Sequence, residues 1–489
     1  MGSTAISHGR VDFHRRPPGL RCSGAPFIEQ SLFQLQFRFQ GCAESPSGGR
    51  ARWKGQGMAF RNGLAAAAAV AIAIGAGFGL RGAQSFTIPN ACVEGSACAY
   101  VCSSVLEQGR TAADFIALAA YQLGPERPII LPPANLSMPA PVDPHNVYAG
   151  AGVGMFSPAV EGQPSRVYSP NLVTGKVDVI DPETFKVIDS LVAMPSPEHI
   201  VPSWDLQTLW VSADVSARGG HGGVAPIDPR TGKVGKVVDV PDSYNIYFTP
   251  DGKSAIVVAE AMRRLEFRDA HSMALQGYIA TPQCAGINHA DFSPDGSYAI
   301  FTCEFNDSLA KIDLVHHTLV ETLPLTLGHM PQDIRVAPDG KIFFIADLTG
   351  DGVMVVDGDS FGQLDFIKTG VGAHGLYPSR DGTKLYVSNR GTHSLGGARK
   401  GPGSVSVIDF ASRKVVANWT VPGGGSPDMG NLSADGKWLW LSGRYDGMIY
   451  AFNTDDGSVK SIPVGGMPHG LTVWPQPGRY SLGHTGNMR

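Results

Sequence analysis

Residues 373–389 read AHGLYPSRDGTKLYVSN, and residues 404–409 read SVSVID. The first segment holds an apolar run, an Asp-Gly turn and a second apolar run that ends at Asn389, and the second segment ends at Asp409. Short apolar runs bounded by such turn residues predict antiparallel β-strands. The same unit recurs along the chain, and a repeat of this size decides the architecture.

The copies of this unit share a turn between their first two strands and an acidic end to their third. The turns are Pro250-Asp-Gly252, Pro294-Asp-Gly296, Pro338-Asp-Gly340, Arg380-Asp-Gly382 and Ala434-Asp-Gly436, with Trp204-Asp205 in an earlier copy. The third strands are VDVID (177–181), VAPID (224–228), AKIDL (310–314), VMVVD (353–357) and SVSVID (404–409). The spacing is about 41 to 46 residues, except in the copy that carries an insert at 391–403. Four short strands in each such unit are typical of a β-propeller blade.

Six complete copies begin near residues 197, 243, 287, 330, 372 and 426. A first copy, residues 166–195, lacks its innermost strand, and residues 470–474 supply a spare strand near the C-terminal end. Pairing the two removes the exposed sheet edges that an open ring would leave. The sequence therefore predicts an all-β, seven-bladed β-propeller over residues 163–489, in which the C-terminal strand completes blade one.

The first 162 residues do not follow this repeat. Residues 85–162 are expected to form an irregular extension, with a short helix near 111–123 and a wrap over 128–144, where six prolines fall. Residues 64–80 are 17 uncharged residues that follow Arg61, so residues 58–84 are interpreted as a signal peptide or as an N-terminal membrane anchor. Both interpretations predict an exported propeller, periplasmic or extracellular. Residues 1–57 have no periodicity, and we expect a disordered tail or residues upstream of the true start.

The repeats resemble those of the YVTN-type propeller family. His374-Gly-Leu, Asp381-Gly382, the run at 385–389 and the run at 404–409 carry the resemblance, which covers residues 163–474. That family is similar to the haem d1-binding propellers, so the resemblance brings haem d1 into consideration as a cofactor. Those propellers have eight blades, and the seven predicted here depart from that pattern.

In a propeller, the residue before each innermost strand and the residue after each second strand converge at one end of the central channel. The first of these positions is polar in every copy: His199, Asn245, His289, Gln332, His374, Asp428 and His469. The second position supplies Glu260, Glu304 and Asp347, and Arg390 and Arg444 lie one residue further on. Imidazole nitrogens suit copper or zinc, and carboxylates would orient them.

The four histidines and three carboxylates are therefore candidate metal residues, and Asn245, Gln332, Asp428, Arg390 and Arg444 are candidate cofactor contacts. The alternative is that these polar residues only hold turns, since their side chains bond nearby backbone groups.

Cys284 and Cys303 flank the first two strands of blade four. Three interpretations stay open: a disulfide, inert buried thiols, or metal ligands acting together with His289.

A net charge of -4 and a pI near 6.4 exclude the basic footprint of a nucleic-acid-binding protein. The sequence has no G-x-S-x-G, P-loop or dinucleotide-binding motif, which favours binding over catalysis. The leading hypothesis is an exported, monomeric protein that binds a metal or small cofactor at the channel mouth, for delivery, sensing or assembly. Two alternatives are a metal-dependent hydrolase or oxidoreductase with Glu260, Glu304 or Asp347 as base, and a scaffold without ligand. The glycine-rich inserts at 219–223 and 391–403 are interpreted as a lid or as a loop face where an exported partner protein would dock, and the alternative is that they are tolerated surface insertions.

Overall fold

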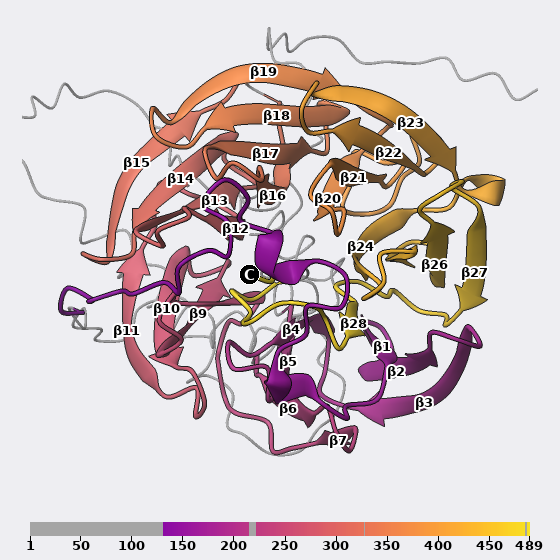
Figure 1. Ribbon diagram of the computed structural model, residues 1–489, viewed down its shortest axis with the longest axis horizontal. Helices are drawn as coiled ribbons and strands as arrows, with labels where there is room; N and C mark the ends of the chain where they lie inside the picture. The colour runs from indigo at the N-terminus through magenta and orange to yellow at the C-terminus, as the bar shows by residue number, and fades with distance from the viewer. Residues whose placement is uncertain (1–130, 215–221, 327, 485–486) are drawn as a thin grey trace, which may run out of the picture. The chain divides into compact units, whose positions relative to one another are not determined.

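The computed structural model describes residues 131–214, 222–326, 328–484 and 487–489. Within these residues, seven four-stranded antiparallel sheets stand around one central channel, as Figure 1 shows. The predicted all-β, seven-bladed propeller is confirmed.

The innermost and second strands of the blades carry the residues that face the channel. In blades one to seven, the innermost strands are β28 (Thr472–Trp474), β4 (Pro197–Pro202), β8 (Asn245–Phe248), β12 (Ile287–Phe292), β16 (Pro331–Val336), β20 (Ala373–Pro378) and β24 (Pro427–Leu432). The second strands are β1 (Arg166–Asn171), β5 (Leu209–Ala213), β9 (Ser254–Ala259), β13 (Tyr298–Cys303), β17 (Ile342–Asp347), β21 (Lys384–Asn389) and β25 (Trp438–Gly443).

The third strands are mostly buried, whereas the outermost strands are more exposed. The third strands are β2 (Lys176–Asp181), β6 (Ala225–Asp228), β10 (Arg264–Asp269), β14 (Ser308–Asp313), β18 (Gly352–Asp357), β22 (Ser404–Asp409) and β26 (Met448–Asn453). The outermost strands are β3 (Lys186–Val192), β7 (Lys233–Val234), β11 (Leu275–Ala280), β15 (Thr318–Pro324), β19 (Gly362–Lys368), β23 (Lys414–Thr420) and β27 (Val459–Pro463). Three 3₁₀ turns complete the described elements: η1 (Ala149–Ala151), η2 (Pro158–Val160) and η3 (Pro422–Gly424).

The Asp-Gly turns work through local hydrogen bonds. Asp251 Oδ1 accepts a hydrogen bond from the backbone N–H of Lys253 at 3.2 Å, and Gly252 between them has φ +70°. A Cβ atom at Gly252 would lie 2.5 Å from the Trp204 ring of the neighbouring blade, so both the backbone angle and the packing require glycine. The repeat seen in the sequence therefore records a turn that joins the innermost strand to the second one.

The ring closes between the two ends of the repeat region. β28 pairs with β1 in antiparallel register, with Val473 opposite Val167 and Thr472 opposite Tyr168. The predicted closing strand is confirmed, although it begins at Thr472 rather than at residue 470. Residues 468–470 make only isolated bridges to other strands, for example between Gly470 and His199 of β4. The reason is that the chain crosses here from blade seven to the centre of the ring.

Buried polar side chains join neighbouring innermost strands. Asp291 of β12 accepts a hydrogen bond from the N–H of Val336 at 2.8 Å, and Asp333 of β16 accepts one from the N–H of Leu376 at 2.9 Å. Each carboxylate thus satisfies a backbone donor of the next blade that no sheet hydrogen bond reaches. These hydrogen bonds fix the orientation of one blade relative to the next, and so they also fix the positions of the innermost strands around the channel.

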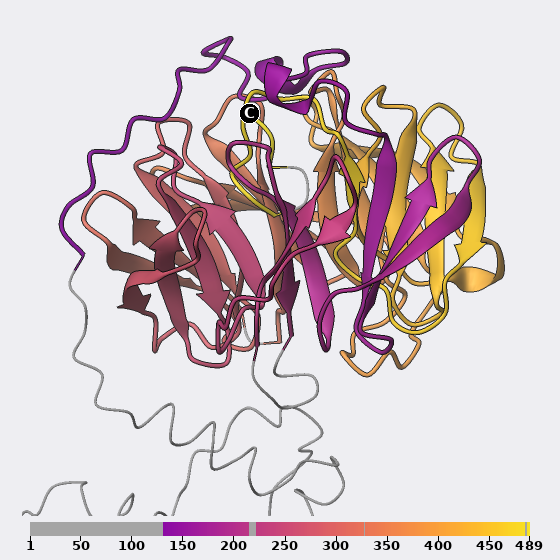
Figure 2. The ribbon, with the colours of Figure 1, turned by 90° about the horizontal axis from the view of Figure 1, so that it is seen from below.

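Two segments outside the blades cover the same side of the ring. Residues 131–165 run over this side, where the N–H of Val147 donates to the carbonyl of Pro338 at 2.9 Å. Residues 475–484 and 487–489 return to it after β28, and Phe156 forms a bridge with Gly478. Figure 2 shows the first segment in indigo and the second in yellow on one side of the propeller. The predicted wrap over 128–144 is described from residue 131, and residues 131–141 form no regular secondary structure.

The predictions for residues 1–57, for the signal or anchor at 58–84 and for a helix at 111–123 lie outside the described residues. Among the described residues, no helix has the length and apolarity that crossing a bilayer needs.

The closing strand gives the first testable prediction. Val473 is 3% exposed, and Val473→Asp should lower the free energy of unfolding by about 3 kcal/mol or more, because it buries an unpaired carboxylate in the closing sheet. Val416→Asp is the matched control: Val416 is 58% exposed on β23, and we expect a loss of about 1 kcal/mol or less. Urea unfolding followed by fluorescence measures both. Equal losses of unfolding free energy in the two variants would contradict the prediction that the closing sheet at β28 stabilises the ring.

Candidate functional site

Four predicted histidines meet inside the channel. His199 of β4, His289 of β12 and His374 of β20 are joined there by His469, which precedes β28. The distances between ring centroids are 4.8 Å for His199–His469, 5.6 Å for His199–His289, 5.8 Å for His374–His469 and 6.2 Å for His289–His374. The structure therefore brings these four imidazoles into one cluster.

A fifth imidazole, His484, lies in the same cluster and was missed by sequence reasoning. Its ring centroid is 4.6 Å from that of His289 and 5.1 Å from that of His199. His484 comes from the segment after β28, which no repeat alignment includes. In the sequence, the one sign of this placement was the glycine that precedes His484. A Cβ atom at Gly483 would lie 2.4 Å from the Cα of Tyr247, so only glycine lets this segment approach β8.

The histidines are buried rather than placed at an open mouth, which corrects the expected position. All five are at most 1% exposed. The segment 475–489 enters the channel on one side, and the side chains of Arg390 and Arg444 lie over the cluster on the other, bonded to its carboxylates.

Asp428 of β24 orients two of the imidazoles. Its Oδ2 atom lies 2.6 Å from His469 Nδ1, and its Oδ1 atom lies 2.9 Å from His374 Nδ1. Arg390 Nε donates to the same Oδ1 at 2.5 Å. Burial raises the pKa of Asp428, but the Arg390 guanidinium and the two imidazoles outweigh it and hold that pKa well below its usual range. Asp428 is therefore an anion, and His469 donates to it from Nδ1, which leaves the lone pair of Nε2 directed away from Asp428.

Glu198 lies on the other side of His469. Its Oε1 atom accepts a hydrogen bond from Arg444 Nη1 at 2.8 Å and lies 3.2 Å from His469 Nε2. Burial raises the pKa of Glu198 to about 8, even though Arg444 acts in the opposite direction. Sequence reasoning missed Glu198 because only blade two has an acid beside its histidine; the pair Glu198-His199 was the available signal.

The imidazoles are held neutral. Burial, together with the nearby Arg390 and Arg444, lowers the pKa of His199 to about 3 and that of His374 to about 4. No hydrogen-bond partner for either ring nitrogen of His199 exists among the described residues. Neutral imidazoles with free ring nitrogens are the form in which histidine binds metals.

The predicted outer carboxylates do not act as one set. Glu304 accepts hydrogen bonds from Asn288 Nδ2 at 2.6 Å and from Gln332 Nε2 at 2.9 Å. Burial and the neighbouring Glu304 raise the pKa of Glu260 well above its usual value. Asp347 is held by the loops of its own blade.

The contacts of Asp347 show why it is separate. It contacts His329 Nδ1 and accepts hydrogen bonds from the N–H groups of Met330 and Gly350, each at 3.0 Å. These contacts occupy both carboxylate oxygens, so the structure does not place Asp347 as a base for chemistry in the channel.

Among the described residues, two groups of three side chains have ligand atoms close enough to share one metal ion. Glu198, His199 and His469 form one, and His289, Asp333 and His484 form the other; within each group, one ligand atom per residue lies within 4.8 Å of the others. All six residues are buried. Asn245 belongs to neither group, but its Nδ2 atom lies 3.3 Å from His289 Nδ1 and 2.9 Å from His484 Nδ1.

Cys284 and Cys303 are joined by a disulfide bond, with their Cα atoms 4.9 Å apart. These two sulfur atoms are therefore not thiolate ligands that act together with His289.

The insert at 391–403 is fastened to the rest of this face. His393 Nε2 lies 2.6 Å from Asp351 Oδ1, and Arg399 Nη1 donates to the carbonyls of Gly424 and Gly425 at 2.6 and 2.7 Å. Most of the insert at 219–223 lies outside the described residues.

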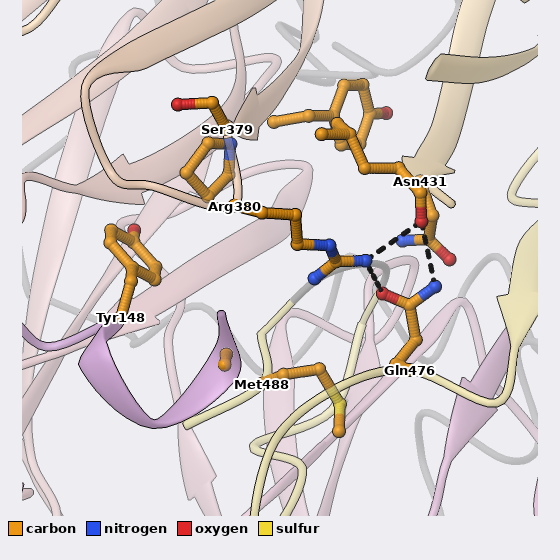
Figure 3. Close-up of a pocket in the computed structure, with 10 residues that line it drawn as sticks. Tyr148, Ser379, Arg380, Asn431, Gln476 and Met488 are labelled. Atoms are coloured by element: carbon orange, nitrogen blue, oxygen red, sulfur yellow. Dashed lines mark hydrogen bonds between the residues drawn. The ribbon is translucent and has the colours of Figure 1, made fainter. Parts of the chain in front are cut away.

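A pocket on the side covered by residues 131–165 lies apart from the histidines. Figure 3 shows Arg380 projecting into it toward Gln476 and Asn431, with Tyr148 and Met488 along its edges. Arg380 Nη2 donates to Gln476 Oε1 at 2.5 Å and to the carbonyl of Leu432 at 2.9 Å. The guanidinium is used in holding segment 475–489 to blade six, so this pocket is a packing feature.

Comparison with known proteins places the chain among propellers. The family described as YNCE-like beta-propeller matches residues 138–477, and no curated protein sequence matches the chain. The periplasmic gluconolactonase PpgL of Pseudomonas aeruginosa aligns with a TM-score of 0.53 and 17% identity, over 64% of this chain and 99% of that one.

Two further solved structures are similar at the level of the fold. A functionally unknown protein from Desulfotomaculum acetoxidans aligns with a TM-score of 0.51 and 15% identity, over 63% of this chain and 99% of that one. The dihydro-heme d1 dehydrogenase NirN aligns with a TM-score of 0.49 and 16% identity, over 74% and 85%. The family match over residues 138–477 confirms the resemblance inferred from the repeats, and solved structures at 15 to 17% identity show the fold alone.

The pKa of His374 predicts how pH acts on the metal-free protein. Between pH 6.5 and about 4, the unfolded chain protonates this imidazole while the folded protein keeps it neutral, so folding stability falls as pH falls. The contribution is about 1.4 kcal/mol for each pH unit in that window. Urea unfolding at pH 6.5 and 4.5 with a chelator present should show a larger loss for the wild type than for His374→Gln. Parallel losses in the two proteins would contradict the buried, neutral imidazole.

Proposed function

This chain belongs to the YNCE-like β-propeller family, and from that premise we propose that it is an exported binding protein for a transition metal. Glu198, His199 and His469 hold one copper or zinc ion inside the channel. The role that follows is delivery, sensing or assembly in the exported compartment.

The observation that carries this proposal is the contact between His469 and Glu198. Because Asp428 accepts the hydrogen of His469 Nδ1, the Nε2 atom faces the Glu198 carboxyl with its lone pair, 3.2 Å away. Two electron-rich atoms at this distance need a cation between them, either a proton or a metal ion. Burial raises the pKa of Glu198 to about 8, so we assign the proton to this carboxyl in the metal-free protein at neutral pH. A metal ion that binds these two atoms displaces that proton.

His199 supplies the third ligand. Its ring centroid lies 4.8 Å from that of His469, and both of its nitrogens are buried without hydrogen-bond partners among the described residues. A buried polar atom without a partner costs free energy, and a metal ion removes that cost. Two imidazoles and a carboxylate suit zinc and copper better than calcium or magnesium, which prefer oxygen ligands.

The surroundings of these ligands support the same chemistry. Arg390 fixes Asp428, which fixes His469, and Arg444 fixes Glu198. Hydrogen bonds to the groups that hold a metal orient the ligands and set the imidazole tautomer. When Glu198 is ionised, the two guanidinium groups balance the charges of the two carboxylates, so both carboxylates stay fixed as hydrogen-bond acceptors in the buried site.

Haem d1 does not fit the same channel. The five imidazoles fill it with their ring centroids 4.6 to 6.2 Å from their neighbours. A macrocycle is wider than any of these gaps, so it would have to push the innermost strands apart. A channel filled in this way has room for a single ion, and we assign no haem chemistry to it.

Metal loading tests the proposal. The full exported chain, stripped with a chelator and loaded with zinc, should retain at least one zinc ion per chain by elemental analysis. His199→Ala should weaken zinc binding at this site by about 100-fold or more, since loss of a group that merely orients a ligand already costs about 10- to 100-fold. His316→Ala is the control, because His316 pairs with Asp313 on the exposed surface. Unchanged zinc affinity in His199→Ala, or no retained zinc or copper in the wild type, would overturn the proposal.

The export part of the proposal has its own support. The buried disulfide Cys284–Cys303 is typical of proteins that fold in an oxidising compartment. Protein recovered from the periplasm or medium should resist alkylation at both cysteines until it is reduced, as measured by peptide mass. Absence of the chain from both fractions would contradict export, and alkylation of Cys284 and Cys303 without prior reduction would contradict the disulfide that supports it.

A further inference from the structure

We infer that the channel holds a second transition-metal ion, bound by His289, Asp333 and His484. This site goes beyond the proposed function, because it shares no ligand with Glu198, His199 and His469. It is built from three separate parts of the chain: β12, β16 and the segment that follows β28.

The three side chains are close enough to share one ion. One ligand atom from each lies within 4.8 Å of the other two. The His289 and His484 ring centroids are 4.6 Å apart, and His484 Nε2 lies 3.7 Å from Asp333 Oδ1. His289 Nε2 is buried and has no hydrogen-bond partner among the described residues. An unpartnered imidazole nitrogen beside a second imidazole and a carboxylate is the donor set that zinc and copper take.

Asp333 is held rigidly for this role. Its Oδ1 atom accepts hydrogen bonds from the N–H of Ile334 at 2.9 Å and from Arg335 Nη1 at 3.2 Å, and its Oδ2 atom accepts one from the N–H of Leu376 at 2.9 Å. Carboxylates that bind metals are themselves hydrogen-bonded, which fixes their direction. Arg335 also offsets part of the negative charge.

Asn245 makes the second site weaker than the first. Its Oδ1 atom accepts from the N–H of Ile246 at 2.8 Å, so its amide nitrogen is the atom that faces the Nδ1 atoms of His289 and His484. Both imidazoles therefore carry their proton on Nε2. For Nε2 to bind a metal, each proton must move to Nδ1 and the amide must turn its oxygen toward them. The first site has no such cost, since Asp428 already accepts from His469 Nδ1.

His199 lies between the two sites. Its ring centroid is 4.8 Å from that of His469 in the first site and 5.1 Å from that of His484 in the second. Two ions held on either side of one imidazole are near neighbours. Two copper(II) ions in these positions are therefore expected to couple magnetically.

The second ion would also fasten the segment that supplies His484. This segment pairs with β8: the N–H of Phe248 donates to the Leu482 carbonyl, and the N–H of His484 donates to the Ile246 carbonyl, each at 3.0 Å. Metal binding adds a bond from the same segment to β12 and β16. Backbone amides of residues 480–484 should then exchange more slowly in the copper-loaded protein.

Copper(II) titration of the full chain tests the second site. We expect two copper ions per chain by elemental analysis, the second binding more weakly, and an electron paramagnetic resonance signal below that of two isolated ions. His484→Gln should retain one copper ion with a full-intensity signal, while the surface control His316→Gln retains two.

The possible outcomes separate the two sites. One copper ion in both the wild type and His484→Gln overturns the second site and leaves the first. One copper ion that is lost in His484→Gln but kept in His199→Ala supports the second site and overturns the first. No copper in the wild type overturns both.

Asn245→Asp keeps the test valid if His484→Gln fails to fold. An aspartate accepts from both Nδ1–H groups without turning, so it should tighten the weaker copper ion by about 10-fold or more. If Asn245 only holds the fold together, the same change should leave copper affinity unchanged or lower it, and that result would contradict the second site.

Discussion

The pairing of β28 with β1 governs the rest of this molecule. It ties residues at the two ends of the repeat region into one sheet, and only a closed ring holds seven innermost strands at a fixed distance from a common axis. His469 precedes β28 directly, and the segment carrying His484 follows it. Two of the five imidazoles therefore reach the channel only because this strand is in place, and an open ring would hold neither candidate metal site.

Burial turns the channel from a polar surface into a site with defined protonation. Desolvation keeps the histidines neutral and raises the pKa of Glu198, while Asp428 remains an anion because Arg390 and two imidazoles surround it. In a channel filled with water these pKa values would lie close to their usual values, since water screens charges and solvates each group separately. Among the described residues, the same burial leaves ring nitrogens without partners, and this supports the proposal that the cluster binds a metal ion.

The fold could be predicted from the sequence because its signals are local. Each Asp-Gly turn requires a positive backbone angle, six of the seven third strands end at an aspartate, and the count of copies leaves one strand to be shared. Register within the repeat also predicted that His199, His289, His374 and His469 occupy equivalent positions. Their convergence follows from the ring itself.

The remaining site residues could not be predicted, because their positions depend on contacts between parts of the chain that are far apart in the sequence, and the repeat pattern does not reveal these contacts. Asp347 stands at the same aligned position as Glu260 and Glu304, yet a neighbouring loop of its own blade takes up its carboxylate. Glu198 and Asp333 point into the channel although neither stood at an aligned candidate position. His484 lies beyond the last blade, and its place depends on how the chain folds back after β28. These positions depend on the direction of each side chain and on how the chain folds back after β28. Neither can be read from the spacing of residues in the sequence.

X-ray absorption at the zinc edge, measured on the chain loaded with one equivalent of zinc, tests the central claim most directly. The site made by Glu198, His199 and His469 predicts two imidazole nitrogens and a carboxylate oxygen at about 2.0 to 2.2 Å, with the multiple scattering that imidazole rings give. A sulfur shell at about 2.3 Å, or an oxygen-only shell without imidazole scattering, would contradict it.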